Sequence, residues 1–208
     1  ALAGVAFANA FLGINHSLSH KLGGWFHIPH GTANALLAPY VCKFNAQRHP
    51  YHMGTFSQYK YPQAFERYVE LGELIGVKGK NDEETFKNWI KALEQLKADI
   101  DIPPTICDWL CEAHPEKSAE DWEKEFLAAV DQMSEWAFHD ACTGANPVYP
   151  MIGELKQVYL RAFYGDDKFI EKYGDVLCLE INNPTDTHAA YPLGLTAEIG
   201  EDKVGGFK

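Results

Sequence analysis

The sequence predicts an all-α fold over most of its 208 residues, followed by an irregular C-terminal tail. Two observations support this fold class: apolar residues recur at helical spacing in successive segments, and Gly, Pro or capping residues separate the segments. The hydrophobic content of 46% is ordinary for a globular protein, and the chain is long enough to bury a sizeable core. We therefore expect a helical domain over residues 1–165 and a C-terminal extension over residues 166–208.

The first predicted helix covers residues 1–21, which are apolar and rich in Ala, and the Gly23-Gly24 pair is expected to end it. No stretch reaches the roughly 18 apolar residues of a membrane span, so we expect no membrane partner. Because the apolar pattern starts without a capping residue before Ala1, we also expect the chain to be the later part of a longer polypeptide.

A turn and a second apolar helix follow. Pro29 and Gly31 flank His30 and predict a turn at this histidine, because Pro restricts the backbone and Gly permits a close reversal. The next helix is expected over residues 31–46, with a kink at Pro39. This arrangement returns His30 toward the first helix.

Further helices are predicted by capping residues and by apolar stripes. Asn81 with Glu84, and Ser118 with Asp121, have the spacing of helix starts. The expected ranges are 62–76, 82–99, 105–113, 119–141 and 150–164. These segments complete the helical domain.

The tail differs in composition from the helical segments. Residues 175–181 (DVLCLEI) are consistent with a strand, and Asn182, Asn183 and Pro184 predict a turn. Pro, Gly and Thr dominate the residues that follow. We expect this part to be irregular, or to dock on a neighbour as an extension.

Charge and cysteine content restrict the partners and the compartment. The net charge of −11, with no compensating Lys/Arg cluster, argues against nucleic acid and anionic membranes as partners. The five cysteines are odd in number and lack the spacing of a disulfide framework. We expect reduced thiols and a cytoplasmic protein.

Four histidines, His16, His20, His27 and His30, fall within fifteen residues and suggest metal binding, proton transfer, or both. On a helix, His16 and His20 share a face and can chelate one ion, but no Glu follows the first His as in zinc proteases. Alternatively, His16 and His30 meet at one metal and His20 stands beside it, facing substrate or solvent. Spacing alone leaves both arrangements open.

Two histidines do not complete a catalytic metal site, so such a site needs further ligands. His139 and Asp140 lie at a predicted helix end, where a capping role and a functional role are equally consistent with the sequence. The spacing of the remaining candidates to the histidine run is unconvincing, and we expect them on loop surfaces. They are His49, His52 and His114.

Three stretches of the sequence carry a resemblance to a known family. They are AGVAFANAFLGINHSLSHKLGGWFHIPHGTANALLAPYV, TFSQYKYPQAFERYVELGELIG and CTGANPVYPMIGELKQVYLRAFYG. They resemble the iron-dependent (group III) alcohol dehydrogenases, and specifically the C-terminal alcohol dehydrogenase part of bifunctional aldehyde–alcohol dehydrogenases. Val148 departs from the pattern, because the bifunctional enzymes typically carry Arg at that point.

The resemblance implies the helical metal-binding domain of such an enzyme, paired with an upstream dinucleotide-binding domain that also carries an Asp and a His ligand. It assigns His16 and His30 to Fe2+, with Zn2+ as the alternative metal. It places His20 and His27 in the substrate and nicotinamide cleft, as catalytic and cofactor-binding residues. His20 is then the candidate proton relay, and His27 a second relay member or a residue that orients NAD.

The implied reaction interconverts an aldehyde, such as acetaldehyde, and a primary alcohol, such as ethanol, with NAD(H) as the hydride carrier. The family also implies a homo-oligomer or helical filament (a spirosome). The candidate contact surfaces are Tyr51, Tyr59, Tyr61 and the tail 174–208; alternatively, these residues cover the core of the domain itself. The chain alone is expected to be inactive. The alternative is a non-catalytic helical interaction or filament-forming module that binds metal incidentally.

Overall fold

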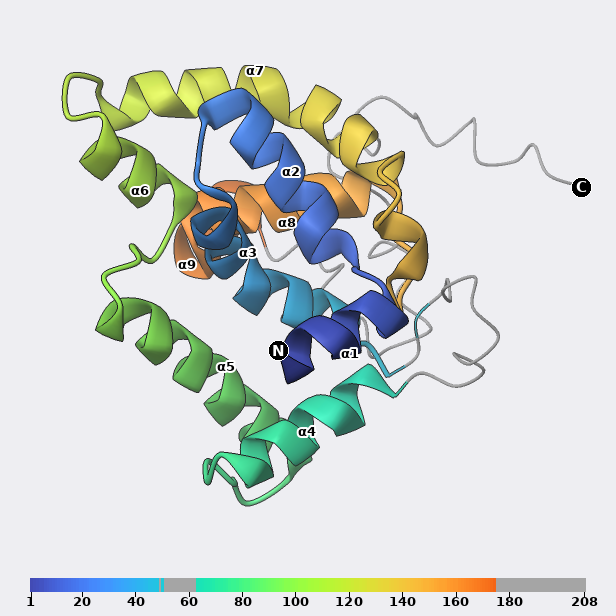
Figure 1. Cartoon of the computed structure of the whole chain (residues 1–208). Coiled ribbons are helices and arrows are strands. Elements are labelled where there is room, and N and C mark those ends of the chain that lie inside the picture. Colours follow the sequence, from blue (N-terminus) through green and yellow to red (C-terminus); the bar gives the residue numbers. More distant parts are fainter. Residues whose placement is uncertain (49, 51–62, 175–208) are drawn as a thin grey trace, which may run out of the picture.

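The computed structural model describes residues 1–48, 50 and 63–174, and helices dominate this part of the chain (Figure 1). The elements are α1 (Leu2–Ala10), α2 (Ile14–Phe26), α3 (His30–Asn45), α4 (Ala64–Leu74), α5 (Asp82–Asp99), α6 (Ile106–Ala113), α7 (Ala119–Phe138), the short 3-10 helix η2 (Thr143–Ala145), α8 (Ile152–Tyr164) and α9 (Asp166–Tyr173). No strand occurs among these described residues. The predicted all-α fold is confirmed.

The core lies where α2, α3, α7 and α8 pack together, with α6 and α9 closing one end. Phe126 of α7 is fully buried and stacks on Phe163 of α8, with ring centroids 4.2 Å apart. Phe26 of α2 also stacks on the Phe126 ring, with centroids 5.6 Å apart, and Tyr159 contacts the Phe126 ring edge-on at 6.3 Å. Aromatic pairs of this kind add to the free energy gained by burial. We call α2, α3 and α6–α9 the bundle.

Helices α4 and α5 form a hairpin that packs mainly on itself and lies below the bundle in Figure 1. Tyr68 stacks on Trp89 with centroids 4.7 Å apart, and Phe65 contacts Phe86 at 5.6 Å. Gly72 permits the close approach of the two helices, since a Cβ there would lie 3.0 Å from the Thr85 side chain. The hairpin therefore has a small apolar cluster of its own.

The N-terminal segment differs from the prediction. The expected helix over residues 1–21 is two helices, because the chain breaks after Ala10: Phe11 has a φ of 62° and Gly13 is the extended N-cap of α2. The Gly23-Gly24 pair does not end a helix either. Both glycines lie inside α2, whose buried apolar face continues to Phe26. The free energy gained by burying this face exceeds the cost of roughly 1 kcal/mol that each glycine imposes on a helix.

The turn predicted at His30 is wrong: His30 is the first residue of α3. Its N-cap is Pro29, whose φ of −54° suits a helix start. The chain reverses three residues earlier, at His27, which has left-handed backbone angles and donates its N–H to the Gly23 carbonyl. Pro39 lies inside α3 and is buried.

The predicted helices over 62–76, 82–99, 105–113, 119–141 and 150–164 correspond to α4, α5, α6, α7 and α8 within a few residues. Residues 166–173, assigned to the extension, form α9, whose Phe169 is fully buried in the core. The strand expected at 175–181 and the turn at 182–184 lie outside the described residues. Among the helices that are described, none is long and apolar enough to cross a membrane.

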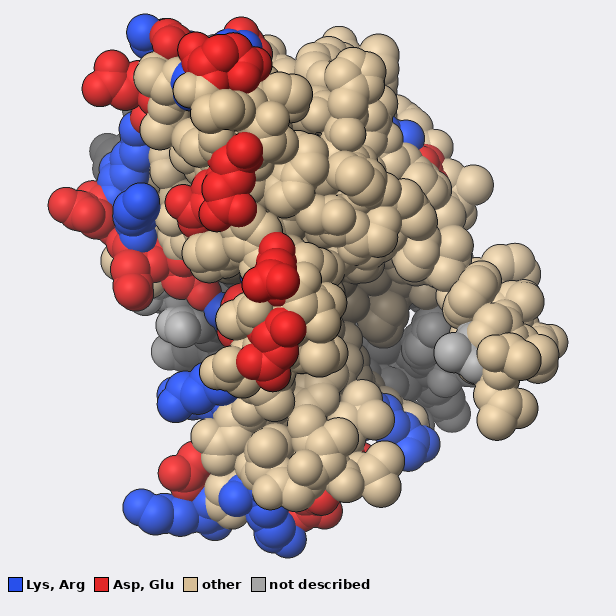
Figure 2. All heavy atoms as spheres, turned by 60° about the vertical axis from the view of Figure 1, so that its left-hand side comes forward, with Lys and Arg blue, Asp and Glu red and all other residues tan. Residues whose placement is uncertain are grey.

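Charged side chains are unevenly distributed on the surface. In the view of Figure 2 they gather along the left-hand side, and a broad area beside them carries neither sign of charge. Helix α1 has no charged residue, and its Leu2, Val5 and Phe7 are 89%, 62% and 53% exposed. An apolar helix left this open is suited to contact another protein surface.

Candidate metal centre

Three of the four clustered histidines come together in the structure. His16 and His20 lie on successive turns of α2, and His30 begins α3 beside them. The ring centroids are 6.2 Å apart for His16 and His20, 5.2 Å for His16 and His30, and 5.6 Å for His20 and His30. The reversal at His27 produces this arrangement, because it brings the start of α3 back alongside α2.

Neighbouring polar side chains hold His30 in place. The buried Ser19 hydroxyl donates to the His16 carbonyl (3.0 Å) and lies 3.5 Å from His30 Nδ1. Asn34 donates to the His30 carbonyl (2.9 Å), and its amide nitrogen lies 3.1 Å from His30 Nε2. Asn15 of α2 in turn donates to Asn34 Oδ1 at 2.8 Å. Such partners fix the orientation of a ligating ring.

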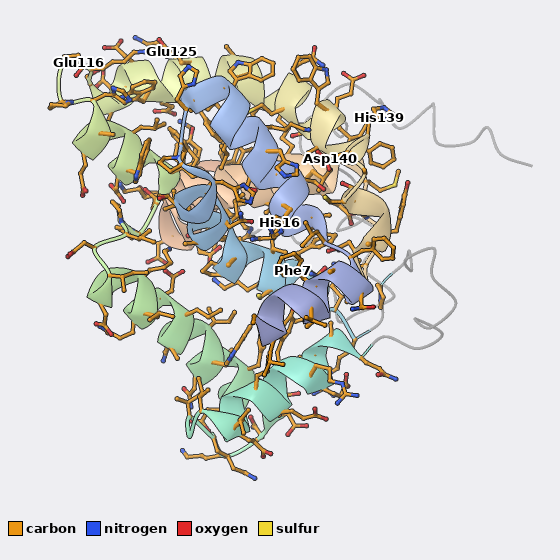
Figure 3. All side chains as sticks on the ribbon, viewed as in Figure 1. Phe7, His16, Glu116, Glu125, His139 and Asp140 are labelled. Atoms are coloured by element: carbon orange, nitrogen blue, oxygen red, sulfur yellow. The ribbon has the colours of Figure 1, made fainter. Side chains whose placement is uncertain are left out.

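His20 is paired with a carboxylate from a distant part of the chain. Its Nδ1 lies 3.0 Å from Asp140 Oδ2, and Lys21 donates to the same oxygen at 2.8 Å. The other oxygen of Asp140 accepts the backbone N–H of Cys142 at 3.0 Å. Figure 3 shows Asp140 beside α2, on the same side as His16, whereas Glu116 and Glu125 lie toward the far end of α7.

These contacts set the protonation of the site. Burial alone would raise the pKa of Asp140, but the bonds from Lys21, Cys142 and His20 outweigh it and hold this pKa well below its usual range. Burial, followed by the neighbouring His30 and His20 rings, lowers the pKa of His16, while Asp140 acts in the opposite direction. A neutral imidazole beside a carboxylate is the form in which histidine can bind a metal.

The loop after α7 is anchored to α2 and α3 by buried polar groups. Asn146 accepts the backbone N–H of Ile14 at 3.2 Å and donates to Asn45 Oδ1 at 2.6 Å. Thr143 Oγ1 lies 2.7 Å from Ser17 Oγ. Asn146 and Thr143 are each 1% exposed. This anchoring positions Asp140 next to His20.

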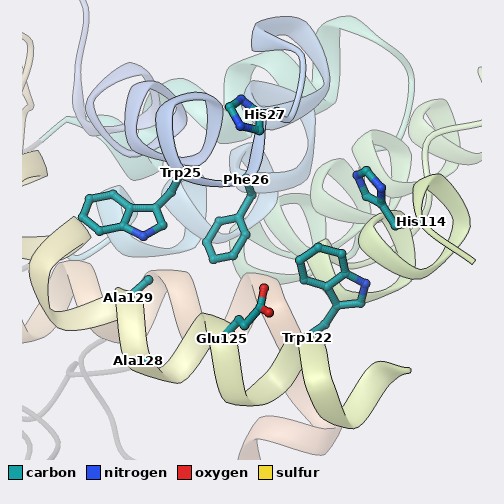
Figure 4. Close-up of a pocket in the computed structure, with 8 residues that line it drawn as sticks. All are labelled: Trp25, Phe26, His27, His114, Trp122, Glu125, Ala128 and Ala129. Carbon is teal, nitrogen blue, oxygen red and sulfur yellow. The ribbon is translucent and has the colours of Figure 1, made fainter. Parts of the chain in front are cut away.

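His27 lies apart from the other three histidines. In the described residues, no hydrogen bond or ring contact joins it to them, and it is exposed. It lines a separate open cavity of about 400 Å³ with Trp25, Trp122, Glu125 and His114 (Figure 4). The placement of His27 in a nicotinamide cleft stays a prediction.

The other candidates divide clearly. Asp140 joins the cluster, whereas His139 is the exposed C-cap residue of α7. His114, expected on a loop surface, is half-buried against Trp122. His49 and His52 lie outside the described residues. The sequence did not single out Ser19, Lys21 or Cys142. Lys21 and Cys142 belong to segments more than a hundred residues apart and meet only through Asp140. Ser19 is a serine on a helix, and nothing in the local sequence marks its contact with His30.

The residues present fit two positions of a metal site. His16 and His30 offer imidazole nitrogens from adjacent helices, their rings are 5.2 Å apart, and polar partners orient His30. A catalytic divalent metal takes about three protein ligands, so this pair leaves positions for further ligands and a substrate. In the described part of the chain, one group of three His, Cys or acidic ligand atoms lies within 4.8 Å of each other: His20, Asp140 and Cys142.

Sequence comparisons identify relatives of the chain. Residues 1–163 match the Fe-containing alcohol dehydrogenase family, C-terminal part. The chain is 48% identical over 168 residues to the bifunctional aldehyde-alcohol dehydrogenase AdhE of Escherichia coli (strain K12), covering 80% of this chain and 18% of that protein. It is 37% identical over 166 residues to the NADPH-dependent butanol dehydrogenase of Clostridium saccharobutylicum, covering 80% of this chain and 36% of that protein.

Solved structures are similar in fold. An iron-containing alcohol dehydrogenase from Thermococcus thioreducens aligns with a TM-score of 0.58 and 32% identity, covering 79% of this chain and 35% of that one. A 1,3-propanediol oxidoreductase aligns with a TM-score of 0.59 and 29% identity, covering 78% and 35%. The chain thus spans between about a fifth and about a third of the length of these relatives.

Proposed function

The chain belongs to the Fe-containing alcohol dehydrogenase family, and from this premise we propose that it supplies the helical half of a metal-dependent, NAD(H)-linked alcohol dehydrogenase. The observation that carries the proposal is the convergence of His16, His20 and His30, with the Asp140 carboxylate bonded to His20. The proposed reaction interconverts an aldehyde such as acetaldehyde and a primary alcohol such as ethanol.

His16 and His30 would hold the metal, Fe2+ or alternatively Zn2+. The remaining ligands and the dinucleotide-binding domain would come from a preceding segment. When bound, the metal supplies a Lewis acid for the substrate oxygen, and the nicotinamide carries the hydride. Ser19 and Asn34 contribute by orienting the His30 ring toward its place. Their effect is on position, because neither side chain is a preferred ligand for these metals.

His20 is the proposed proton relay. Donation of its Nδ1–H to Asp140 leaves Nε2 as the proton acceptor, and the ring is 39% exposed and therefore in reach of solvent. During alcohol oxidation Nε2 accepts the hydroxyl proton and passes it to water; during aldehyde reduction the proton moves in the opposite direction. Asp140 keeps the ring in this tautomer and orientation, and Lys21 keeps the carboxylate ionised.

The remaining roles rest more on the family than on local contacts. His27 is proposed as a second relay member or as a residue that orients the nicotinamide. NAD is the proposed cofactor, although a butanol dehydrogenase related to this chain is NADPH-dependent.

The exposed apolar α1 supports contact with another domain or subunit, and a homo-oligomer or filament is proposed on that basis. The cytoplasm is the proposed location, and the free thiols of Cys42, Cys107, Cys111 and Cys142 are consistent with it.

The second candidate function is a helical interaction or filament-forming module with incidental metal binding. The exposure of α1 favours it, since a large uncharged surface is typical of interfaces. It predicts that the metal is dispensable for assembly and that His20 has no effect on any rate.

The test is metal analysis and kinetics of the full-length protein purified without oxygen. His16→Ala and His30→Ala should lose stoichiometric metal and activity. His20→Ala should keep the metal and lose about 10²–10⁴-fold in rate, the range of a general acid–base group. His139→Ala, which removes an exposed histidine at the end of α7, is the matched control and should change neither. Full metal retention by both His16→Ala and His30→Ala would contradict the ligand assignment.

A further inference from the structure

Three donor groups of different chemistry meet next to the histidine cluster. The ligand atoms of His20, Asp140 and Cys142 lie within 4.8 Å of one another, and they come from α2 and from the loop after α7. An imidazole, a carboxylate and a thiol together suit a borderline-soft divalent cation better than a hard one. None of the three is assigned to the proposed catalytic metal.

We propose that His20, Asp140 and Cys142 form a second metal site that takes Zn2+ or a similar borderline-soft cation. Occupation of this site withdraws His20 from proton transfer. The binding stands on the geometry alone, whereas the inhibitory consequence rests on the proposed function.

The observed distances are close to those such a site needs. Tetrahedral Zn2+ with bonds of about 2.0–2.1 Å to nitrogen and oxygen places those two atoms about 3.3 Å apart. His20 Nδ1 and Asp140 Oδ2 are 3.0 Å apart, so the ion takes the place of the Nδ1 proton with an opening of a few tenths of an ångström, and that proton moves to Nε2 of the same neutral ring. A zinc–sulfur bond of about 2.3 Å requires the thiolate about 3.6 Å from the other ligand atoms, an approach of at most about 1.2 Å from the 4.8 Å limit.

The local charges permit this binding. Asp140 is held in its ionised form by Lys21, and its oxygens accept from His20, from Lys21 and from the backbone N–H and thiol of Cys142; the ion takes the place of the His20 and thiol protons at this carboxylate. Burial, and then the bond to Asp140, raise the pKa of Cys142, so the thiol carries a proton before the ion binds. Binding therefore displaces that proton to solvent and creates a zinc–thiolate bond, with no change of oxidation state.

The second site is distinguishable from the first by its sulfur ligand. His16 and His30 contribute nitrogen only, whereas Cys142 contributes a thiolate. Co2+ is a faithful probe of zinc sites, and a thiolate bound to Co2+ gives a charge-transfer band in the near ultraviolet. The band therefore reports the second site whether or not the enzyme is active.

The experiment titrates Co2+ into the reduced protein as wild type and as His16→Ala/His30→Ala, which lacks the proposed catalytic ligands. Both should show the thiolate band at about one equivalent. Cys142→Ala should abolish it, and Asp140→Asn should weaken Co2+ binding by about 10-fold or more. Cys111→Ala removes a thiol on α6, away from the site, and should leave the band unchanged. Far-UV circular dichroism checks that each variant is folded.

Two results would overturn the proposal: no thiolate band in folded wild type, or a band that survives in Cys142→Ala. Activity gives a separate answer. Added Zn2+ should inhibit the full-length wild-type enzyme and should inhibit Cys142→Ala at least 10-fold less. If the protein shows the band but has no dehydrogenase activity, the second metal site stands and the proposed function is refuted. If the protein is active but shows no band, the proposed function stands and the second metal site is refuted.

Discussion

The bundle and the α4–α5 hairpin use the same kinds of interaction at very different sequence separations. In the bundle, Asn146 bonds to Asn45 and Ile14, more than a hundred residues away. Phe126 of α7 is buried against one aromatic ring of α2 and two of α8. In the hairpin, Tyr68 and Trp89 belong to consecutive helices. An ion pair there, Arg67 with Glu70, is 65% and 62% exposed.

This difference indicates which contacts determine the positions of the side chains in the candidate metal centre. Its histidines and Asp140 are placed by long-range contacts within the bundle, so the site forms only when the bundle folds as a unit. The hairpin is held mainly by contacts between its own two helices, so we expect changes inside it to affect the site less than changes in the bundle. The predictions below test that separation, beginning with the largest effect.

Phe126→Ala should reduce the free energy of unfolding by about 3–5 kcal/mol, because it removes a fully buried ring that contacts Phe26, Tyr159 and Phe163. Urea denaturation followed by circular dichroism measures the change. Phe86→Ala, in the half-buried hairpin cluster, is the matched control and should cost clearly less. Equal losses would show that the two regions are one cooperative unit.

Asn146→Ala should cost about 1–3 kcal/mol, since it leaves the Ile14 N–H and the Asn45 side chain without their buried partner. It should also weaken metal binding, because the loop that carries Asp140 loses its anchor. Asn88→Ala in the hairpin breaks a single bond to the Val77 carbonyl and should leave metal binding unchanged. Isothermal titration with metal distinguishes the two; unchanged binding in Asn146→Ala would contradict the anchoring role.

Asp166→Asn should cost about 1–2 kcal/mol at neutral pH, because Asp166 is bonded by Lys43 of α3 and Arg161 of α8. Burial alone would raise the pKa of Asp166, but Lys43 and Arg161 outweigh it and lower this pKa. A lowered pKa contributes stability above the unfolded value of about 3.9, and this is lost as the pH falls through the folded value. The difference from wild type should therefore be constant above about pH 5 and shrink below about pH 4.

Glu70→Gln is the hairpin counterpart of that experiment. It removes an exposed ion pair with Arg67, so the free energy of unfolding should change by less than about 0.5 kcal/mol at any pH. Thermal or urea unfolding between pH 3 and pH 8 provides both curves. An acid-dependent loss in Glu70→Gln as large as that in Asp166→Asn would remove the contrast between the two regions.

Removal of a helix cap should cost about 1 kcal/mol, for Ser118→Ala or for Asn81→Ala. The two caps accept the N–H groups of Asp121 in α7 and Glu84 in α5. Hydrogen exchange should show faster exchange across the bundle for Ser118→Ala, but only in the hairpin for Asn81→Ala. Exchange limited to the first turn of α7 in Ser118→Ala would argue that α7 frays independently.

Helices with capping residues and regular apolar stripes were predictable from the sequence, as α5 and α7 illustrate, because the determining residues are neighbours along the chain. The break between α1 and α2 was not, since the Ile14 N–H at the start of α2 is accepted by Asn146, which lies far away in the sequence. The same reason explains the site: the pairing of His16 and His30 was foreseen as one option, whereas Lys21 and Cys142 acquire their roles only through Asp140. Local pattern cannot show contacts between distant segments.

The break after Ala10 leaves α1 attached to the rest of the domain mainly through the short link to α2. It packs extensively on no other described helix, and it joins α2 through Phe11, Leu12 and Gly13. Gly13 abuts the Asn146 side chain so closely that a Cβ would lie 2.6 Å from Oδ1. Any side chain at position 13 would therefore press on the amide that accepts the Ile14 N–H, so the link between α1 and α2 has no room for a residue larger than glycine at this point. The same Asn146 side chain also bonds to Asn45, so one buried amide joins the start of α2, the end of α3 and the loop that follows Asp140.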